Sequence, residues 1–164
     1  MDPDPSYLDQ IREIGLFGGL GDDVLRSFVA TLEVSEPGAG TVVFKEGESG
    51  RELYVILDGE VEVLRHSKRG HETRVAILGP GDWFGEMSVL DVLPRSATTR
   101  VLAPSHLLRL TAHELDTLYR KDTRSYALLV LNIARELSRR LRVADGLLAE
   151  LVTNVMDEYT RRRP

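Results

Sequence analysis

Cysteine is absent from the 164 residues of this chain, which excludes disulfide bonds and thiolate metal sites. The sequence also lacks any apolar run that approaches the roughly 18–20 residues of a membrane-spanning helix. The opening stretch, MDPDPSYLDQ, is too acidic for a signal peptide. From these absences we expect a cytoplasmic protein with no membrane partner.

Positive charge is scarce: 21 Lys and Arg stand against 26 Asp and Glu, which leaves a net charge of −5 at pH 7. A broad nucleic-acid surface needs clustered cations, so this balance argues against one. Arginines do gather in two places, at Arg135, Arg139, Arg140 and Arg142 and again at Arg161, Arg162 and Arg163. We interpret the first group as the solvated face of a helix and the second as a frayed tail.

Hydrophobic periodicity divides the chain into three parts, which we expect to form one domain over residues 1–164. Residues 6–36 hold two short segments with helical spacing and predict an N-terminal helix pair. Residues 37–111 change to short β-branched segments between glycine or charged turns, the pattern of strands. Residues 112–158 return to helical spacing and predict C-terminal helices.

The expected strands are short and evenly spaced, at Thr41–Lys45, Leu53–Leu57, Val61–Leu64, Arg74–Leu78, Ala97–Leu102 and His106–Leu110. Such strands, punctuated by glycines, are typical of a barrel or jelly roll. We therefore predict an α+β fold: a β jelly-roll barrel with the helix pair before it, a short phosphate-binding helix within it, and a long C-terminal helix that acts as lid and dimerisation element.

The stretch most informative about function is GDWFGEMSVLDVLPRSATT, residues 81–99. Gly85 allows close approach of backbone to a ligand, and residues 86–90 can form one helical turn whose free N–H groups attract an anion. Arg95 offers a planar guanidinium suited to two phosphate oxygens. Glu86 beside an anion site makes sense if it accepts a hydrogen bond from a sugar hydroxyl. Together these residues describe a site for a ribose that carries a phosphate.

This cassette, FGEMS…PRSAT over residues 84–98, resembles the cyclic nucleotide-binding domain family, which includes catabolite activators and regulatory subunits of cyclic-AMP-dependent kinase. The resemblance extends from about Phe17 to Leu148 and includes FKEGESGRELYVILDGEVEV, residues 44–63. It implies that Glu86 binds the ribose 2′-hydroxyl and Arg95 the cyclic phosphate. The ligand-binding set that it implies is Phe84, Gly85, Glu86, Met87, Ser88, Arg95, Ser96, Ala97, Ala144 and Asp145.

Several of these residues have a plainer interpretation. Glu86 and Arg95 can form an ion pair that only stabilises the barrel, as in members of the fold that bind no ligand. Trp83 and Phe84 fit the core better than a stacking role. The family often has Gly-Glu before the Pro-Arg of the cassette, where this chain has Val92 and Leu93.

A long helix beginning near Ser125 carries apolar residues whose spacing alternates four and three, the a/d seam of a coiled coil: Val130, Ala134, Leu137, Leu141, Ala144, Leu148, Leu151 and Val155. Part of this seam can pack on the barrel, but the helix continues beyond the footprint of one barrel. We therefore expect a homodimer through this helix.

The base of the nucleotide depends on the same helix, which closes over the pocket in the family. The resemblance places Ala144 and Asp145 opposite the purine. A carboxylate can accept two hydrogen bonds from guanine, whereas adenine offers no such donor pair. Ser96 can reach a guanine amine or the phosphate. We favour cyclic AMP slightly, keep cyclic GMP open, and note that Asp145 can equally be an exposed helix residue.

Other functional classes fit less well. A metal-dependent cupin needs a histidine cluster, and the four histidines are scattered. No Gly-x-Ser-x-Gly elbow of a serine hydrolase is present. From the scattered histidines and the missing elbow together we expect no metal and no enzyme. Only residues 151–164 remain after the part of the long helix that acts as a lid, which is too short for a recognition helix with its support, so we expect no DNA-binding domain. The expected function is a non-catalytic cyclic-nucleotide sensor that moves its C-terminal helix and acts on an unknown protein; the alternative is a ligand-free dimerisation module.

Overall fold

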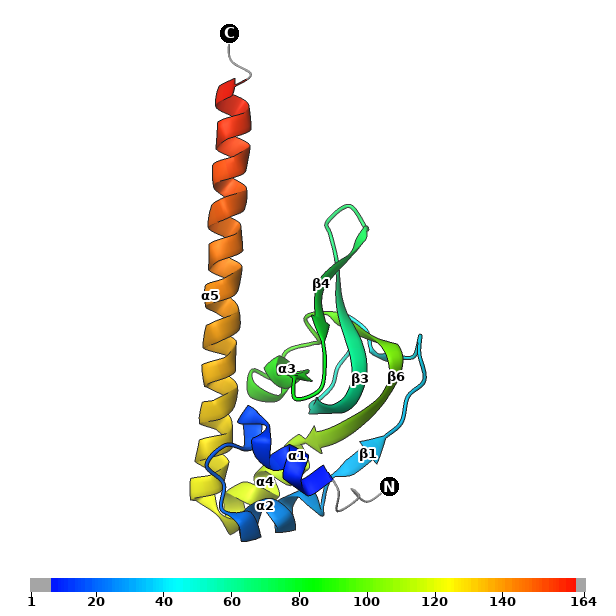
Figure 1. Cartoon of the computed structure of the whole chain (residues 1–164), viewed down its shortest axis with the longest axis vertical. Helices are drawn as coiled ribbons and strands as arrows, with labels where there is room; N and C mark the ends of the chain where they lie inside the picture. Colours follow the sequence, from blue (N-terminus) through cyan, green and yellow to red (C-terminus); the bar gives the residue numbers. More distant parts are fainter. Residues whose placement is uncertain (1–6, 162–164) are drawn as a thin grey trace.

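The computed structural model describes residues 7–161 and arranges them as helices, a sheet and further helices (Figure 1). The helical elements are α1 (Tyr7–Glu13), the 3-10 turn η1 (Gly15–Phe17), α2 (Asp22–Val29), α3 (Glu86–Leu90), α4 (Ala112–Lys121) and α5 (Thr123–Arg161). The strands are β1 (Glu33–Ser35), β2 (Val42–Phe44), β3 (Glu52–His66), β4 (Glu72–Leu78), β5 (Trp83–Phe84) and β6 (Thr98–Thr111). The predicted α+β class is confirmed; residues 1–6 and 162–164 of the predicted domain lie outside the described residues.

All six strands belong to one antiparallel sheet with the central order β1-β6-β3-β4. Strand β2 adds to β6, and β5 adds to β3. The sheet curls around an apolar interior, while the β3–β4 hairpin projects away from it (Figure 1). Within the described residues the ladder of the predicted jelly roll does not close on itself, because the edge strands β1 and β4 are not paired with each other.

Four of the predicted short strands are two long ones. Strands β3 and β6 pair from Glu52↔Thr111 to Leu64↔Thr98, with register shifts between Ile56 and Val61. Gly59 lies at this bend with φ of 94°, and a Cβ there would stand 2.1 Å from the Ser105 hydroxyl. Glycine therefore bends the strand at this position without ending it, because only a residue with no side chain allows the two backbones to approach so closely.

The main core ties the first part of α5 to the helical end of the molecule. Leu129 and Ile133 are fully buried in the same cluster as Phe17 and Leu108. The Asn132 amide donates hydrogen bonds to two carbonyl oxygens of the η1 region, at 3.1 and 2.9 Å. This anchoring fixes the direction in which α5 leaves the globular part and carries it past the cassette.

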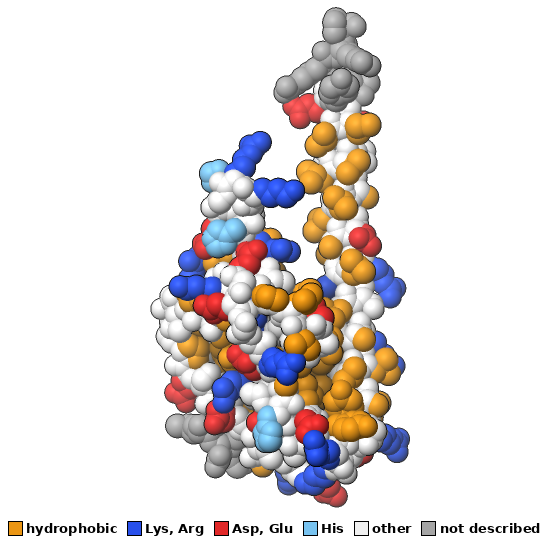
Figure 2. Space-filling view, turned by 180° about the vertical axis from the view of Figure 1, so that it is seen from behind, with side chains coloured by type: hydrophobic (Ala, Val, Ile, Leu, Met, Phe, Trp, Pro, Cys, Tyr) orange, Lys and Arg blue, Asp and Glu red, His pale blue; other side chains and the backbone are white. Residues whose placement is uncertain are grey.

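Beyond the core, α5 extends alone into solvent (Figure 1). Every residue from 141 to 158 is exposed. Apolar side chains follow the helix along this stretch (Figure 2), and the seam residues Leu141, Leu148, Leu151 and Val155 are 58–61% exposed. None of the described helices combines the length and apolarity that a membrane span requires.

Candidate ligand-binding site

The site begins where β5 turns into α3. Gly85 is the N-cap of α3 and has φ of 86°, in the left-handed region that favours glycine. A Cβ at Gly85 would lie 2.8 Å from the Arg95 guanidinium and 2.9 Å from the Glu52 carbonyl oxygen. A side chain at this position would therefore push the arginine away from α3. The predicted turn over residues 86–90 coincides with α3, so the start of this helix and Arg95 do lie together.

Arg95 is almost completely buried, at 3% exposure. Its Nη1 atom donates to three oxygens: the Glu52 carbonyl at 2.7 Å, the Ser88 hydroxyl at 2.8 Å and the Gly85 carbonyl at 3.1 Å. The guanidinium carbon stands 3.9 Å from the centre of the Phe44 ring. These contacts hold the guanidinium in one orientation before any ligand arrives. Ser88, predicted to contact the ligand, is buried and serves here to position Arg95.

The opposite edge of the same guanidinium is free to donate. Among the described residues, buried atoms Nε and Nη2 of Arg95 have no hydrogen-bond partner. The Glu52 carboxylate lies 2.8 Å from Nη2, without the direction of a hydrogen bond. A Cβ at Gly50 would stand 2.6 Å from Nη2 and 2.7 Å from Nε. Glycine thus keeps space beside two parallel donors, which is the arrangement that binds two phosphate oxygens.

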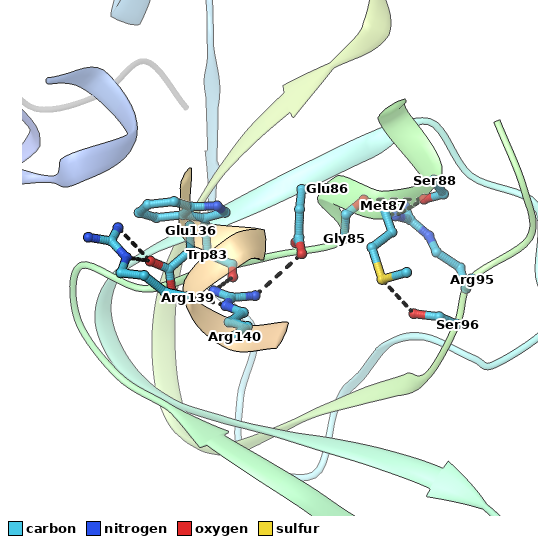
Figure 3. Close-up of polar contacts among 10 residues, drawn as sticks. All are labelled: Trp83, Gly85, Glu86, Met87, Ser88, Arg95, Ser96, Glu136, Arg139 and Arg140. Atoms are coloured by element: carbon cyan, nitrogen blue, oxygen red, sulfur yellow. Dashed lines mark hydrogen bonds and ion pairs between the residues drawn. The ribbon is translucent and has the colours of Figure 1, made fainter. Parts of the chain in front are cut away.

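Glu86 faces away from Arg95 and toward α5 (Figure 3). It is 4% exposed, and its carboxylate lies 3.3 Å from Nη1 of Arg140. Arg140 also donates to the Trp83 carbonyl at 2.8 Å and to Glu136 at 3.1 Å. Burial raises the pKa of Glu86, although the charge of Arg140 opposes that rise. A charged residue of the long helix therefore sits directly on the carboxylate predicted to bind ribose.

Sequence reasoning missed two charged residues of this site. It assigned Arg140 to a solvated helix face, and it gave Glu52 no role. Both meet their partners across long stretches of chain, since Arg140 is 54 residues from Glu86 and Glu52 is 43 residues from Arg95. The one signal available was the arginine run itself, which gave no hint of which member turns inward.

The remaining predicted residues divide between core and rim. Phe84 is buried and stacks on Tyr54, with ring centres 5.4 Å apart, and Ala97 is buried as well. Met87 is 45% exposed, and its sulfur accepts a hydrogen bond from the Ser96 hydroxyl at 3.5 Å (Figure 3). The structure thus places the Phe84 and Ala97 side chains in the packing beneath the cassette and leaves Met87 and Ser96 at its surface.

Ala144 and Asp145 are exposed on the part of α5 that extends into solvent. At 100° per residue, Ala144 lies about 40° around the helix from Arg140, and Asp145 about 140°. Ala144 therefore shares the cassette-facing side of α5, whereas Asp145 is turned away from it. In this conformation neither is brought into the site.

The simple ion pair between Glu86 and Arg95 does not form. Each has another partner, Arg140 for the first and Glu52 for the second. Trp83 is 5% exposed within the main core, as expected. As for the cupin alternative, no group of three or more His, Asp or Glu side chains in the described part of the chain could hold a metal ion.

Known proteins from several bacteria resemble this chain in sequence and in fold. The chain is 31% identical over 146 residues to a CRP-like cAMP-activated global transcriptional regulator of Mycobacterium tuberculosis, covering 88% of this chain and 63% of the relative. It is 35% identical over 130 residues to a cyclic AMP receptor protein of Thermus thermophilus, covering 79% and 58%. A solved cyclic nucleotide-binding domain from Methylobacillus flagellatus superposes with a TM-score of 0.82 at 25% identity, covering 88% of this chain and 84% of that one.

These relatives correct one expectation. We expected no DNA-binding domain, because only residues 151–164 remain after the lid part of the long helix. The relative from M. tuberculosis is a transcriptional regulator, and the chain spans only about three-fifths of the length of the curated relatives that it matches. The length of sequence after residue 151 is therefore no argument against a connection to DNA.

The family itself follows from the match over the sheet and the cassette. Residues 37–122 match a family described as the cyclic nucleotide-binding domain. This matched range includes the residues at the start of α3 and beside Arg95: Gly85, Glu86, Met87, Ser88, Arg95 and Ser96. The resemblance inferred from the FGEMS…PRSAT cassette is thereby confirmed, and the chain belongs to the cyclic nucleotide-binding domain family.

Proposed function

We propose that this protein is a non-catalytic sensor that binds a cyclic mononucleotide at the α3–Arg95 cassette. The observation that carries the proposal is the free edge of the buried Arg95 guanidinium, whose Nε and Nη2 lack a hydrogen-bond partner within the described residues. Buried N–H donors without an acceptor are costly, and the two oxygens of a phosphodiester would satisfy both nitrogen atoms. The N–H groups at the start of α3 would add to the attraction of the anion.

The ribose would meet Glu86, and this contact would reach the long helix. In the structure the Glu86 carboxylate forms an ion pair with Arg140 of α5. A ribose hydroxyl that donates to Glu86 would compete with Arg140 or rearrange it. Ligand binding would therefore favour a different position of α5, by the difference in affinity of the ligand for the two positions.

We propose that the ligand is cyclic AMP, whose base is adenine. The two curated relatives described above are named for cyclic AMP. Guanine recognition by Asp145 would need a large rotation of α5, because Asp145 is turned about 140° from the residue that faces the cassette. Ala144 on the cassette side offers no acceptor to distinguish the bases. The regulated process that we propose is transcription, because the relative from M. tuberculosis is named as a transcriptional regulator.

Isothermal titration calorimetry of the folded chain with cyclic AMP and cyclic GMP tests this function. Wild type should bind cyclic AMP, and Arg95→Ala should lose about 2–5 kcal/mol of binding free energy because the phosphate loses its cation. Arg69→Ala, which removes a charge from the exposed β3–β4 turn, is the matched control and should bind normally.

Circular dichroism would verify that Arg95→Ala is folded, and Arg95→Lys provides a second variant that keeps the charge without the planar pair of donors. Failure of folded wild type to bind either nucleotide would reject the sensor and leave the ligand-free dimerisation module.

A further inference from the structure

The Glu52 carboxylate lies beside Arg95, the residue proposed to bind the phosphate. A negative charge at this position is unfavourable for phosphate binding. The Glu52 carboxylate lies 2.8 Å from Nη2 of Arg95, and its side chain is 29% exposed. The guanidinium does not depend on this carboxylate for its orientation. Nη1 is already held by the Glu52 carbonyl, the Ser88 hydroxyl and the Gly85 carbonyl, and the Phe44 ring lies against the guanidinium face.

The ion-paired charges around the cassette sum to zero. Arg95 pairs with Glu52, Arg140 pairs with Glu86 and Glu136, and Glu136 pairs also with Arg139. The site therefore offers directed donors but no excess of positive charge. A phosphate oxygen that accepts from Nη2 would share this nitrogen with the Glu52 carboxylate, so the two acceptors would be at most about 6 Å apart. Each added negative charge on the phosphate would be repelled by Glu52 at short range.

The two kinds of nucleotide phosphate differ in this respect. A cyclic phosphodiester has no second ionisable oxygen and carries one negative charge. A phosphate monoester, such as 5′-AMP, has a second pKa near 6 and carries a charge of about −1.5 to −2 at neutral pH. The site has no net charge and holds a carboxylate next to the phosphate. It therefore disfavours a phosphate group that carries a second negative charge.

We infer that Glu52 is a specificity-determining residue that makes the cassette select singly charged phosphodiesters over doubly charged phosphate monoesters. This inference rests on the proposed function and adds to it the class of phosphate that is accepted. Such selection would allow a cyclic-nucleotide sensor to exclude 5′-AMP, in which the phosphate ring is opened while the base and the ribose are the same.

The experiment is calorimetric titration of wild type, Glu52→Gln and Glu60→Gln with three probes: cyclic AMP, 5′-AMP and the monomethyl ester of 5′-AMP. The methyl ester is uncyclised but singly charged, so it separates charge from ring shape. Glu60→Gln removes the same charge from an exposed position of the same strand and controls for the overall change in net charge.

In Glu52→Gln the preference for cyclic AMP over 5′-AMP should shrink by about tenfold. This is the effect of removing one repulsive contact between like charges at a partly buried side chain. The preference for cyclic AMP over the methyl ester should stay as in wild type, and Glu60→Gln should match wild type with every probe.

Two results would overturn the inference while leaving the sensor intact. Equal changes for cyclic AMP and 5′-AMP in Glu52→Gln would show that Glu52 only positions Arg95. Equal gains for 5′-AMP and its methyl ester would show that ring shape, and not charge, is at issue. Absence of any cyclic AMP binding by folded wild type would instead reject the proposed function itself.

Discussion

The Glu86 carboxylate is buried beneath α5, and this burial raises its pKa above the ordinary value of 4.5. Because the folded-state pKa lies above the unfolded one, the folded protein binds more protons between the two values. The free energy of unfolding therefore falls as pH rises through that range. Ionisation of Glu86 thus reduces the stability of the folded protein at neutral pH, even with Arg140 beside it.

We predict that Glu86→Gln removes this part of the pH dependence. The unfolding free energy of the variant relative to wild type should rise as the pH increases from 4.5 toward neutrality, as measured by urea denaturation. Arg140 keeps Glu136 and the Trp83 carbonyl as partners in the variant, so it is not left unpaired. A difference that stays constant across this pH range would mean that Glu86 titrates alike in the folded and unfolded chain.

At the scale of the element, helix α3 is followed by a strained residue. Val92 has φ of 60°, and it is the single non-glycine residue with positive φ in the described part of the chain. A left-handed backbone conformation is unfavourable for a β-branched residue. Because Val92 is 57% exposed, packing of its side chain contributes little stability to offset this strain. Val92→Asn should raise the free energy of unfolding by about 1 kcal/mol, since asparagine tolerates this conformation.

Thermal unfolding followed by circular dichroism measures that gain. Leu93→Asn is the matched control: it removes an equally exposed apolar side chain, at 61%, from a residue without positive φ. It should change the unfolding free energy by less than about 0.5 kcal/mol. Equal effects of the two substitutions would assign the change to lost apolar surface and not to backbone strain.

The elements also show what local sequence can predict. Helix α3 was predicted at its observed bounds, because a glycine that must be left-handed and a short run of helix formers are local features. The break expected between Leu57 and Val61 was wrong, because Gly59 bends β3 where its partner strand approaches, and a sequence does not display its partner. The roles of Glu52 and Arg140 depend on contacts across the fold, so neither could be found from spacing alone.

The whole molecule presents a helix that its own globular part does not support. Helix α5 has 39 residues, and residues 141–158 are all exposed. Isolated helices are marginally stable in water, and most helical stability in proteins comes from packing of an apolar face. The seam residues Leu141, Leu148 and Leu151 form such a face and are unburied in one chain. A second copy of α5 packed along this seam would bury it, and we propose a homodimer on this basis.

Leu141→Glu combined with Leu148→Glu should convert this dimer to a monomer, because each substitution would bury a carboxylate against its counterpart in the other copy. Sedimentation equilibrium over a wide concentration range measures the change, and the melting temperature of wild type should rise with concentration, as it does when folding is linked to association. The matched control is Ala149→Glu combined with Thr153→Glu, which adds the same charges at exposed positions about 100–140° around the helix from Leu148. The control should remain dimeric. A wild-type chain that sediments as a monomer at every concentration, with a melting temperature independent of concentration, would exclude the seam as a dimer interface and require another occupant for the apolar face of α5.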